Sequence, residues 1–310
     1  MYSIPILLIT FNRAEHTRKV LSAIMEQQPA ELYVFQDGCR PGNTEDSEAC
    51  NAVRRVISEL TGGTNTSLHT FYSESNLGCG PGPSKAISWF FSNVNRGIIM
   101  EDDCLPDSTM FFFYQYLLDK YDQDDSVTMI TATNVFKKWK SHCASYFFAT
   151  NGASPMGCWA GWAKYWKSFD YSIASWRNDV NKTKLRRFFD RKEYYDYYSD
   201  LYDKLSLVPQ RHMWDYQWAY SRYLLGSKTI VAAKNLVTNI GFTRGATHSS
   251  DGNHRFANLP LFSMEKIKDP HCESIDKQFN YLYFFRNNYR PKKSYFIKIR
   301  LKILEYLFCR

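Results

Sequence analysis

The first 132 residues alternate short apolar runs with helical segments, and this alternation constrains the fold more than any other feature of the chain. The apolar runs that we predict as strands are Ile4–Thr10, Leu32–Gln36, Leu68–Tyr72, Gly97–Met100 and Val127–Thr131. The segments that we predict as helices are Glu15–Met25, Thr44–Leu60, a stretch with Ile87, Phe90 and Phe91 on one side, and Met110–Tyr121. Strands and helices that alternate at these lengths form a mostly parallel sheet. The sequence therefore predicts an α/β fold, with a Rossmann-like, mostly parallel sheet flanked by helices.

Three of the predicted strands run into segments suited to a polar ligand. These segments are Thr10–Arg13, Asp37–Gly38 and Glu101–Asp103. In sheets of this kind the ligand sits beyond the carboxyl ends of the strands. Three polar strand endings at one edge support a ligand-binding site more strongly than one does, so we place the candidate site there. The turn Gly78–Gly82 lacks the spacing of a phosphate-binding loop, and we interpret it as a tight loop with Lys85 as a candidate phosphate partner.

The run Glu101-Asp102-Asp103 follows directly on an apolar strand. Neighbouring carboxylates repel one another, and their desolvation at the end of a buried strand is costly without a cation or hydrogen-bond donors. A hard divalent metal bound by carboxylate oxygens and nucleotide phosphates would compensate them. The alternative is a solvated acidic turn before the next helix, for which Asp107 and Ser108 provide a start.

The regular alternation ends near Ala132, and the motifs beyond it are less specific. The segment Met156–Trp166 is rich in glycine and aromatic residues, which suits either a surface that stacks on a sugar ring or, as we favour, a packed helix start. The charged, Tyr-rich stretch Arg186–Asp203 is predicted to be helical with a solvated face. The segment His212–Trp218 opens a helix that continues to about Leu225.

Two segments of this second half carry candidate catalytic or binding residues. Asp215 lies among aromatic residues that can raise its pKa toward that of a useful base, although an acid in the first helical turn is also favoured by the helix dipole alone. After a short predicted strand, Ile230–Ala232, a glycine-rich loop carries Arg244 and His248. Arg can pair with a diphosphate and His can ligate a metal, whereas a lone loop His is more often simply exposed.

The net charge of +8 is concentrated at the end of the chain. From Tyr283 to Arg310 there are eight Lys and Arg against Glu305 alone, a net charge of +7. The rest is nearly neutral, which argues against nucleic acid as a partner. If Tyr295–Phe308 is helical, Lys298, Lys302 and Glu305 share one face and apolar residues cover much of the remainder. This pattern predicts either peripheral contact with an anionic membrane or packing on the domain.

The cysteines and the N-terminus indicate a cytoplasmic protein. Eight cysteines are scattered without CxxC or zinc spacing, so we expect reduced thiols. The first residues lack a basic segment, and Ile4–Ile9 is too short for the apolar core of a signal peptide or for a membrane span. We expect a cytoplasmic location, with the C-terminal segment at the inner face of the plasma membrane if it binds lipid.

The motifs together resemble a known family. Pro5–Arg13, Asp37-Gly38, Asn76-Leu77-Gly78 and Glu101-Asp102-Asp103 resemble nucleotide-sugar glycosyltransferases of the GT-A fold. Gln36-Asp37-Gly38, the Glu-Asp-Asp form of the DXD motif, Trp214-Asp215 with Trp218, and Phe242–Gly245 followed by His248 are similar to the N-acetylglucosaminyltransferase I type and to bacterial family-2-like transferases of polysaccharide clusters. The resemblance covers roughly residues 1–255, and the motifs occur in the family's order.

The resemblance implies a role for each matching residue. Thr10, Phe11, Asn12 and Asp37 would hold the nucleotide base and ribose, with Arg13 near the phosphates. Asp103 would bind Mn²⁺ or Mg²⁺, with His248 as a further ligand, while Glu101 and Asp102 would contact ribose or the donor sugar. Asp215 would be the general base of an inverting transfer, and Arg244 would close over the diphosphate. The domains implied are residues 1–255, with a nucleotide-sugar-binding half (1–132) and an acceptor-binding half (133–255), and a basic C-terminal extension (256–310).

The function implied is an inverting, metal-dependent glycosyltransferase. It would move a sugar from a nucleotide-diphosphate donor, expected to be a UDP-sugar, to a hydroxyl of a growing surface glycan or lipid-linked oligosaccharide. One alternative is a sugar-1-phosphate nucleotidyltransferase, whose first loop would be richer in glycine than Thr10–Arg13. The other is a non-catalytic sugar-nucleotide binding module, which would not need Asp215.

Overall fold

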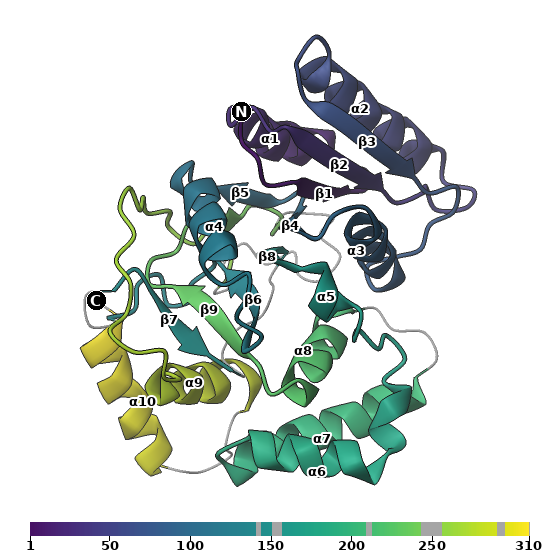
Figure 1. Ribbon diagram of the computed structural model, residues 1–310. Coiled ribbons are helices and arrows are strands. Elements are labelled where there is room, and N and C mark those ends of the chain that lie inside the picture. Colours follow the sequence, from purple (N-terminus) through teal and green to yellow (C-terminus); the bar gives the residue numbers. More distant parts are fainter. Residues whose placement is uncertain (141–143, 151–156, 209–212, 243–255, 290–294, 310) are drawn as a thin grey trace.

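A computed structural model describes residues 1–140, 144–150, 157–208, 213–242, 256–289 and 295–309 (Figure 1). The strands are β1 (Ile6–Thr10), β2 (Glu31–Gln36), β3 (Ser67–Tyr72), β4 (Arg96–Glu101), β5 (Cys104–Pro106), β6 (Val127–Thr131), β7 (Tyr146–Ala149), β8 (Cys158–Trp162), β9 (Lys228–Ala232) and β10 (Val237–Asn239). The helices are α1 (Ala14–Met25), α2 (Thr44–Thr61), α3 (Pro81–Asn93), α4 (Thr109–Lys120), α5 (Ala163–Trp166), α6 (Asp179–Phe188), α7 (Lys192–Leu207), α8 (Asp215–Leu224), α9 (Lys277–Tyr283) and α10 (Tyr295–Phe308), with a 3-10 turn at Ala174–Arg177 and a π turn at Phe284–Asn288.

In the described part of the chain, eight strands form one mostly parallel sheet in the order β3-β2-β1-β4-β8-β6-β9-β7. β3, β2, β1 and β4 pair in parallel, as do β6 and β9, whereas β8 and β7 run antiparallel to their neighbours. β5 and β10 pair as a separate two-stranded sheet. Helices flank the large sheet (Figure 1), with α1 against α2, α3 against β1 and α9 against β7. The α/β class predicted from the alternation is confirmed.

The predicted strands and helices of the first 132 residues are all present. All residues of β1 and β6 are buried, as continuous apolar runs in a parallel sheet require. The Asn43 side chain accepts a hydrogen bond from the backbone amide of Asp46 and so begins α2. Ile87 and Phe90 are fully buried, so the side of α3 that carries them faces the core. The observed boundaries differ from the predicted ones by one or two residues.

Two predictions for the second half were right only in part. Met156–Trp166 was expected to be a packed helix start in preference to a sugar-stacking surface; the aromatic residues are packed, but Cys158–Trp162 forms β8, whose residues are all buried between β4 and β6. The short helix α5 begins only after it. Arg186–Asp203 is not one solvated helix: α6 and α7 are separated at residues 189–191, and Tyr194, Tyr198 and Tyr202 of α7 are buried. Packing of aromatic side chains overrides the charged appearance of this stretch.

The C-terminal segment packs on the far end of the same sheet. Ile275 makes a bridge with Phe148 of β7, and the buried side chains of α9 belong to the same hydrophobic core as the rest of the sheet. The helix predicted at Tyr295–Phe308 is present as α10 and lies against α9. The domain boundary at residue 255 stays a prediction. Among the described helices, none combines the length and apolarity needed to cross a membrane.

Candidate functional site

The three polar strand endings meet at one edge of the sheet, as predicted. The strand register pairs Thr10 with Gln36 and Ile9 with Glu101. The backbone amide of Asp37 donates to the carbonyl of Thr10 at 3.0 Å, and that of Asp102 donates to Ile9 at 3.0 Å. The ends of β1, β2 and β4 therefore lie side by side, and the loop Thr10–Arg13 stands between the two acidic endings.

Arg13 joins this loop to the acidic run. Its guanidinium forms ion pairs with Asp102 and, at 3.1 Å, with Asp103. Asp102 is only 2% exposed, and its second oxygen, Oδ2, is buried without a hydrogen-bond partner among the described residues. One guanidinium therefore pairs with two carboxylates, and Glu101 is a third acid close to them.

Burial and mutual repulsion determine the protonation of the acidic run. Burial raises the pKa of Glu101, and the charges of Asp103, Asp102 and Asp215 raise it further, against the effect of Arg13. Burial also raises the pKa of Asp102, which Arg13 lowers and Asp103 raises again. These carboxyl groups would gain from an additional cation. The contribution of Asp215 also shows that α8 brings this residue within electrostatic range of Glu101.

Two glycines let the chain come close to the acidic run, and the sequence analysis did not identify either. A Cβ on Gly241 would lie 2.2 Å from Oδ2 of Asp103, and a Cβ on Gly157 would lie 2.8 Å from Sγ of Cys104 and 3.1 Å from Oε2 of Glu101. Gly157 also has a positive φ of 74°. Both positions require glycine. The signal in the sequence was the Phe-Thr-Arg-Gly motif, which begins at the residue after Gly241.

Asp37, at the end of β2, is held entirely by its own loops. Its carboxylate accepts hydrogen bonds from the backbone amides of Leu77 at 2.8 Å, Gly78 at 2.9 Å and Gly38 at 2.9 Å, and from Nδ2 of Asn76 at 3.1 Å. Burial raises the pKa of Asp37, and these amides lower it. The structure gives Asp37 a clear role in fixing the turn after β3, while direct contact with a nucleotide stays a prediction.

The turn that Asp37 fixes is close enough to both acidic endings for their charges to act on it. Burial raises the pKa of Cys79, and the charges of both Glu101 and Asp37 act on this thiol. Gly78 has a φ of 80°, so the turn is a tight loop as predicted. Lys85 follows in α3, where its ammonium lies 4.8 Å from the ring centre of Phe71 and its charge lowers the pKa of Asp37.

The other residues of the first loop make internal contacts. The Thr10 hydroxyl donates to the carbonyl of Phe35 at 3.0 Å, and Asn12 donates to Asp46 at 2.7 Å. The guanidinium carbon of Arg40 lies over the Phe11 ring, 5.8 Å from the centre of that ring. The loop is thereby rigidly placed at the edge where the acidic run ends.

Asp215 begins α8 beside a cluster of tryptophans. The rings of Trp159 and Trp218 are 5.7 Å apart, and those of Trp159 and Trp214 are 6.2 Å apart. Trp159 pairs with Ile99 of β4, so the cluster connects α8 to the strand that carries the acidic run. The predicted aromatic surroundings of Asp215 are present.

Arg244 and His248 lie outside the described residues. Before these residues, Gly241 lies against Asp103, and after them Ala257 forms a bridge with Asn239 of β10. Among the described residues, no group of three His, Cys, Asp or Glu side chains is arranged to hold a metal ion.

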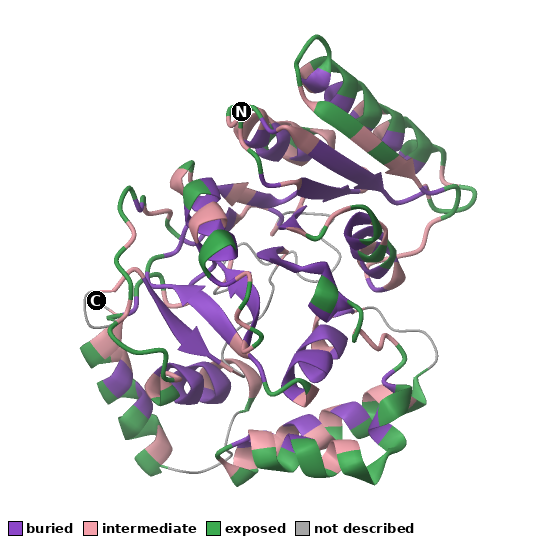
Figure 2. Ribbon diagram, viewed as in Figure 1, coloured by how far each residue is buried: buried purple, intermediate pink, exposed green. Residues whose placement is uncertain are grey.

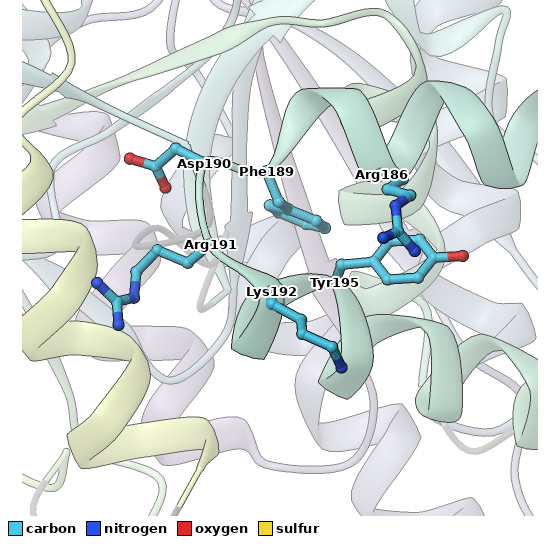
Figure 3. A pocket seen from close by; sticks show the side chains of 6 residues that line it. All are labelled: Arg186, Phe189, Asp190, Arg191, Lys192 and Tyr195. Carbon is cyan, nitrogen blue, oxygen red and sulfur yellow. The ribbon is translucent and has the colours of Figure 1, made fainter.

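A cavity lies between α6 and α7, and it does not include any predicted site residue. This cavity of about 180 Å³ is lined by Arg186, Phe189, Asp190, Arg191, Lys192 and Tyr195 (Figure 3). Asp190 pairs with Lys277, and Arg191 and Lys192 pair with Glu193 and Asp196. Since most of its charges are already paired within the protein, the strand edge is the better candidate site.

Comparison with known proteins adds little about function. No protein-family model matches the chain, and no curated protein sequence matches it. Among solved structures, HddC from Yersinia pseudotuberculosis is 8% identical, with 52% of this chain and 78% of that chain covered and a TM-score of 0.31. A UDP-glucose pyrophosphorylase in complex with UDP-glucose is 10% identical, with 75% and 91% covered and a TM-score of 0.38. Similarities this low carry no functional argument, so the function has to be inferred from the site.

Proposed function

We propose that this protein is an inverting, metal-dependent glycosyltransferase that uses a nucleotide-diphosphate sugar. The observation that carries the proposal is the contact of Arg13 with Asp102 and Asp103 at the edge where β1, β2 and β4 end. A guanidinium beside uncompensated carboxylates suits a diphosphate together with its cation. The order of the motifs and their resemblance to GT-A enzymes support this reading over a solvated acidic turn, and so does the burial of Asp102 and Asp103.

The acidic run fits a hard divalent cation, Mn²⁺ or Mg²⁺. Its donors are carboxylate oxygens alone, and Oδ2 of Asp102 is buried without a partner among the described residues. Such cations are commonly held by one or two carboxylates together with substrate phosphates, which requires no cage of protein ligands. Asp103 is the proposed ligand, with His248 as a second. When bound, the cation stabilises the charge that develops on the departing nucleoside diphosphate.

The remaining roles are proposed from the resemblance to GT-A enzymes. Arg13 would orient the diphosphate, and Glu101 and Asp102 would contact the donor's ribose or sugar. Asp37, through the turn that it fixes, would shape the nucleotide site together with Thr10, Phe11, Asn12 and Lys85. Arg244 is proposed to pair with the diphosphate. The acceptor is proposed to be a surface glycan or a lipid-linked oligosaccharide.

Asp215 is the proposed general base. It lies at the first position of α8, and its charge acts on Glu101, which supports a position of this carboxylate close to the acidic run. Attack from the face opposite to the leaving group requires one carboxylate to take the hydroxyl proton. No protein acid is needed at the leaving group, because its charge is stabilised electrostatically.

The test is a donor panel with Asp215→Asn as the key variant. The purified chain is incubated with nucleotide sugars and Mn²⁺, with and without chelator, and release of nucleoside diphosphate is measured. We expect release to depend on the metal and to fall by about 10²–10⁴-fold in Asp215→Asn, with donor affinity nearly unchanged. Asp179→Asn is the matched control, because Asp179 is also the first residue of a helix, α6, and has the same relation to the helix dipole.

Three results would contradict the proposal in different ways. Release that persists with chelator would exclude the metal role. Equal losses in Asp215→Asn and Asp179→Asn would mean that helix stability, and not proton transfer, is affected. Pyrophosphate produced from a nucleoside triphosphate and a sugar-1-phosphate would identify a nucleotidyltransferase, and donor binding without any turnover would indicate a binding module.

A further inference from the structure

Helix α10 has two apolar faces, and only one of them is packed against the protein. Leu301 and Leu304 are buried on the inner face. At the end of the helix Phe308 stacks on Trp139, with ring centres 4.8 Å apart and planes at 15°. The inner face therefore holds α10 in place without any contribution from the outer one.

Polar contacts fix the same orientation of the helix. Glu305, the only acid in α10, forms an ion pair with Arg286 in which two contacts measure 2.6 Å. The guanidinium of Arg300 lies 4.0 Å from the ring centre of Tyr281 in α9. The single negative charge of the helix is thus neutralised by its neighbour, and the helix is anchored along its length.

The outer face of α10 is apolar and exposed. Phe296 is 84% exposed and Ile303 is 51% exposed. At helical spacing these two residues share one side with three further exposed side chains, Ile299, Tyr306 and Leu307. Figure 2 shows exposed residues alternating with buried ones along this helix, as expected for a helix packed on one side only.

Cations flank this apolar stripe. Lys298 and Lys302, one helical turn apart, lie along one edge of the stripe, and Arg300 lies along the other; all three are exposed. The segment from Tyr283 to Arg310 carries a net charge of +7. An exposed apolar stripe edged with cations is complementary to a surface that is apolar below and negatively charged above.

We propose that the outer face of α10 binds an anionic lipid surface, with the helix lying in the plane of the membrane interface. Its 14 residues span about 21 Å, which is too short to cross a bilayer. The apolar stripe enters the headgroup boundary, and Lys298 and Lys302 contact lipid phosphates. This binding is independent of the proposed transferase activity, since none of its residues belongs to the candidate site.

The test is sedimentation of the full chain with vesicles. Vesicles of phosphatidylcholine with phosphatidylglycerol are compared with vesicles of phosphatidylcholine alone, at low and high salt. We expect binding to the anionic vesicles that weakens with salt. Ile303→Glu should lower the partition coefficient by about tenfold or more, because a charge replaces an apolar side chain in the interface. The double variant Lys298→Gln/Lys302→Gln should lower it by about tenfold or more on anionic vesicles only.

Leu207→Glu is the matched control for Ile303→Glu. Leu207 is 76% exposed at the end of α7, so the substitution introduces the same charge on another exposed apolar residue. Equal loss in both variants, or no binding of the unchanged protein to anionic vesicles, would overturn the proposal. A dimer in sedimentation velocity that Ile303→Glu dissociates, in a chain that does not bind vesicles, would show that a second copy covers the stripe.

Discussion

The strands β2 and β4, which lie on either side of β1, end in buried acids, and the two endings differ in how the acids are satisfied. At the end of β2, Asp37 receives three backbone amides and the Asn76 side chain. At the end of β4, Asp102 and Asp103 share the guanidinium of Arg13, and Phe11 donates a backbone hydrogen bond to Asp102, but Oδ2 of Asp102 has no partner among the described residues. Asp37, Asp102 and Asp103 are all buried, but only at the end of β4 does a buried carboxylate oxygen lack a hydrogen-bond donor among the described residues.

The difference separates an acid with a structural role from the acids that we propose to bind a ligand. A carboxylate whose hydrogen-bonding capacity is used by its own loops stabilises those loops and has little left for a ligand. Carboxylates that are held close together without enough hydrogen-bond donors favour the binding of a cation. Such binding sites commonly lower the stability of the folded protein. We therefore expect substitutions at the two endings to have opposite consequences for binding and for stability.

The largest effect is expected for Asp103→Asn. Loss of the proposed ligand carboxylate should weaken metal-dependent binding of a nucleoside diphosphate by about 10²–10³-fold, as measured by titration calorimetry with Mn²⁺. Asp269→Asn is the control, because Asp269 is a carboxylate that bonds Tyr146 at 2.8 Å and pairs with Lys120 far from the acidic run. Unchanged affinity in Asp103→Asn would remove the distinction between the two strand endings.

The next effect concerns stability. Asp37→Asn should lower the free energy of unfolding by about 1–3 kcal/mol, because an amide nitrogen then faces backbone amides that need an acceptor. Glu101→Gln, the equivalent change at the end of β4, should leave stability nearly unchanged, because burial and the neighbouring acids raise the pKa of Glu101 and so already favour its neutral form at neutral pH. Urea unfolding of both variants at neutral pH measures the difference. A larger loss of unfolding free energy in Glu101→Gln than in Asp37→Asn would show that the structural role belongs to the end of β4 and not to the end of β2.

The smallest effect is a change in how protein stability depends on pH, and it concerns Asp46, whose carboxylate also accepts hydrogen bonds from its neighbours. Hydrogen bonds from Arg40, chiefly, and from Asn12 lower the pKa of Asp46 to about 2. The unfolded value is about 3.9, so these contacts stabilise the fold above about pH 4, and their contribution is lost as the pH falls toward 2. The stability difference between the unchanged protein and Asp46→Asn should therefore shrink between pH 5 and pH 3 in urea unfolding. A difference that stays constant over this range would mean that the ionised form of Asp46 is not what stabilises α2.

The first half of the sheet was predictable because its strands are continuous apolar runs. β1 and β6 are buried on both faces, and such strands need no information from their neighbours to be identified. The predicted meeting of three polar endings at one edge also followed from local sequence, because parallel strands present the same end to the same edge. The register of Thr10 with Gln36 and of Ile9 with Glu101 confirms it.

The second half was not predictable in the same way. β8 contains Trp159 and Trp162 around a small Ala-Gly pair, a composition that does not distinguish a buried strand from a helix start. It becomes a strand because β4 and β6 present hydrogen-bonding edges on both sides of it. β10 and its partner β5, which lies in the first half, have three residues each and are likewise strands only through their pairing with one another.

The sequence by itself determined which residues carry charge at the strand ends, and therefore that this edge of the sheet is polar. It also determined the helix at Tyr295–Phe308, one face of which packs on the domain while the other is exposed. Only the tertiary structure decided that Asp37 is satisfied while Asp102 is not, because hydrogen-bond donors come from segments far apart in the chain. The amides that hold Asp37 lie some 40 residues away, at Leu77 and Gly78, and the Arg13 guanidinium lies 89 residues from Asp102.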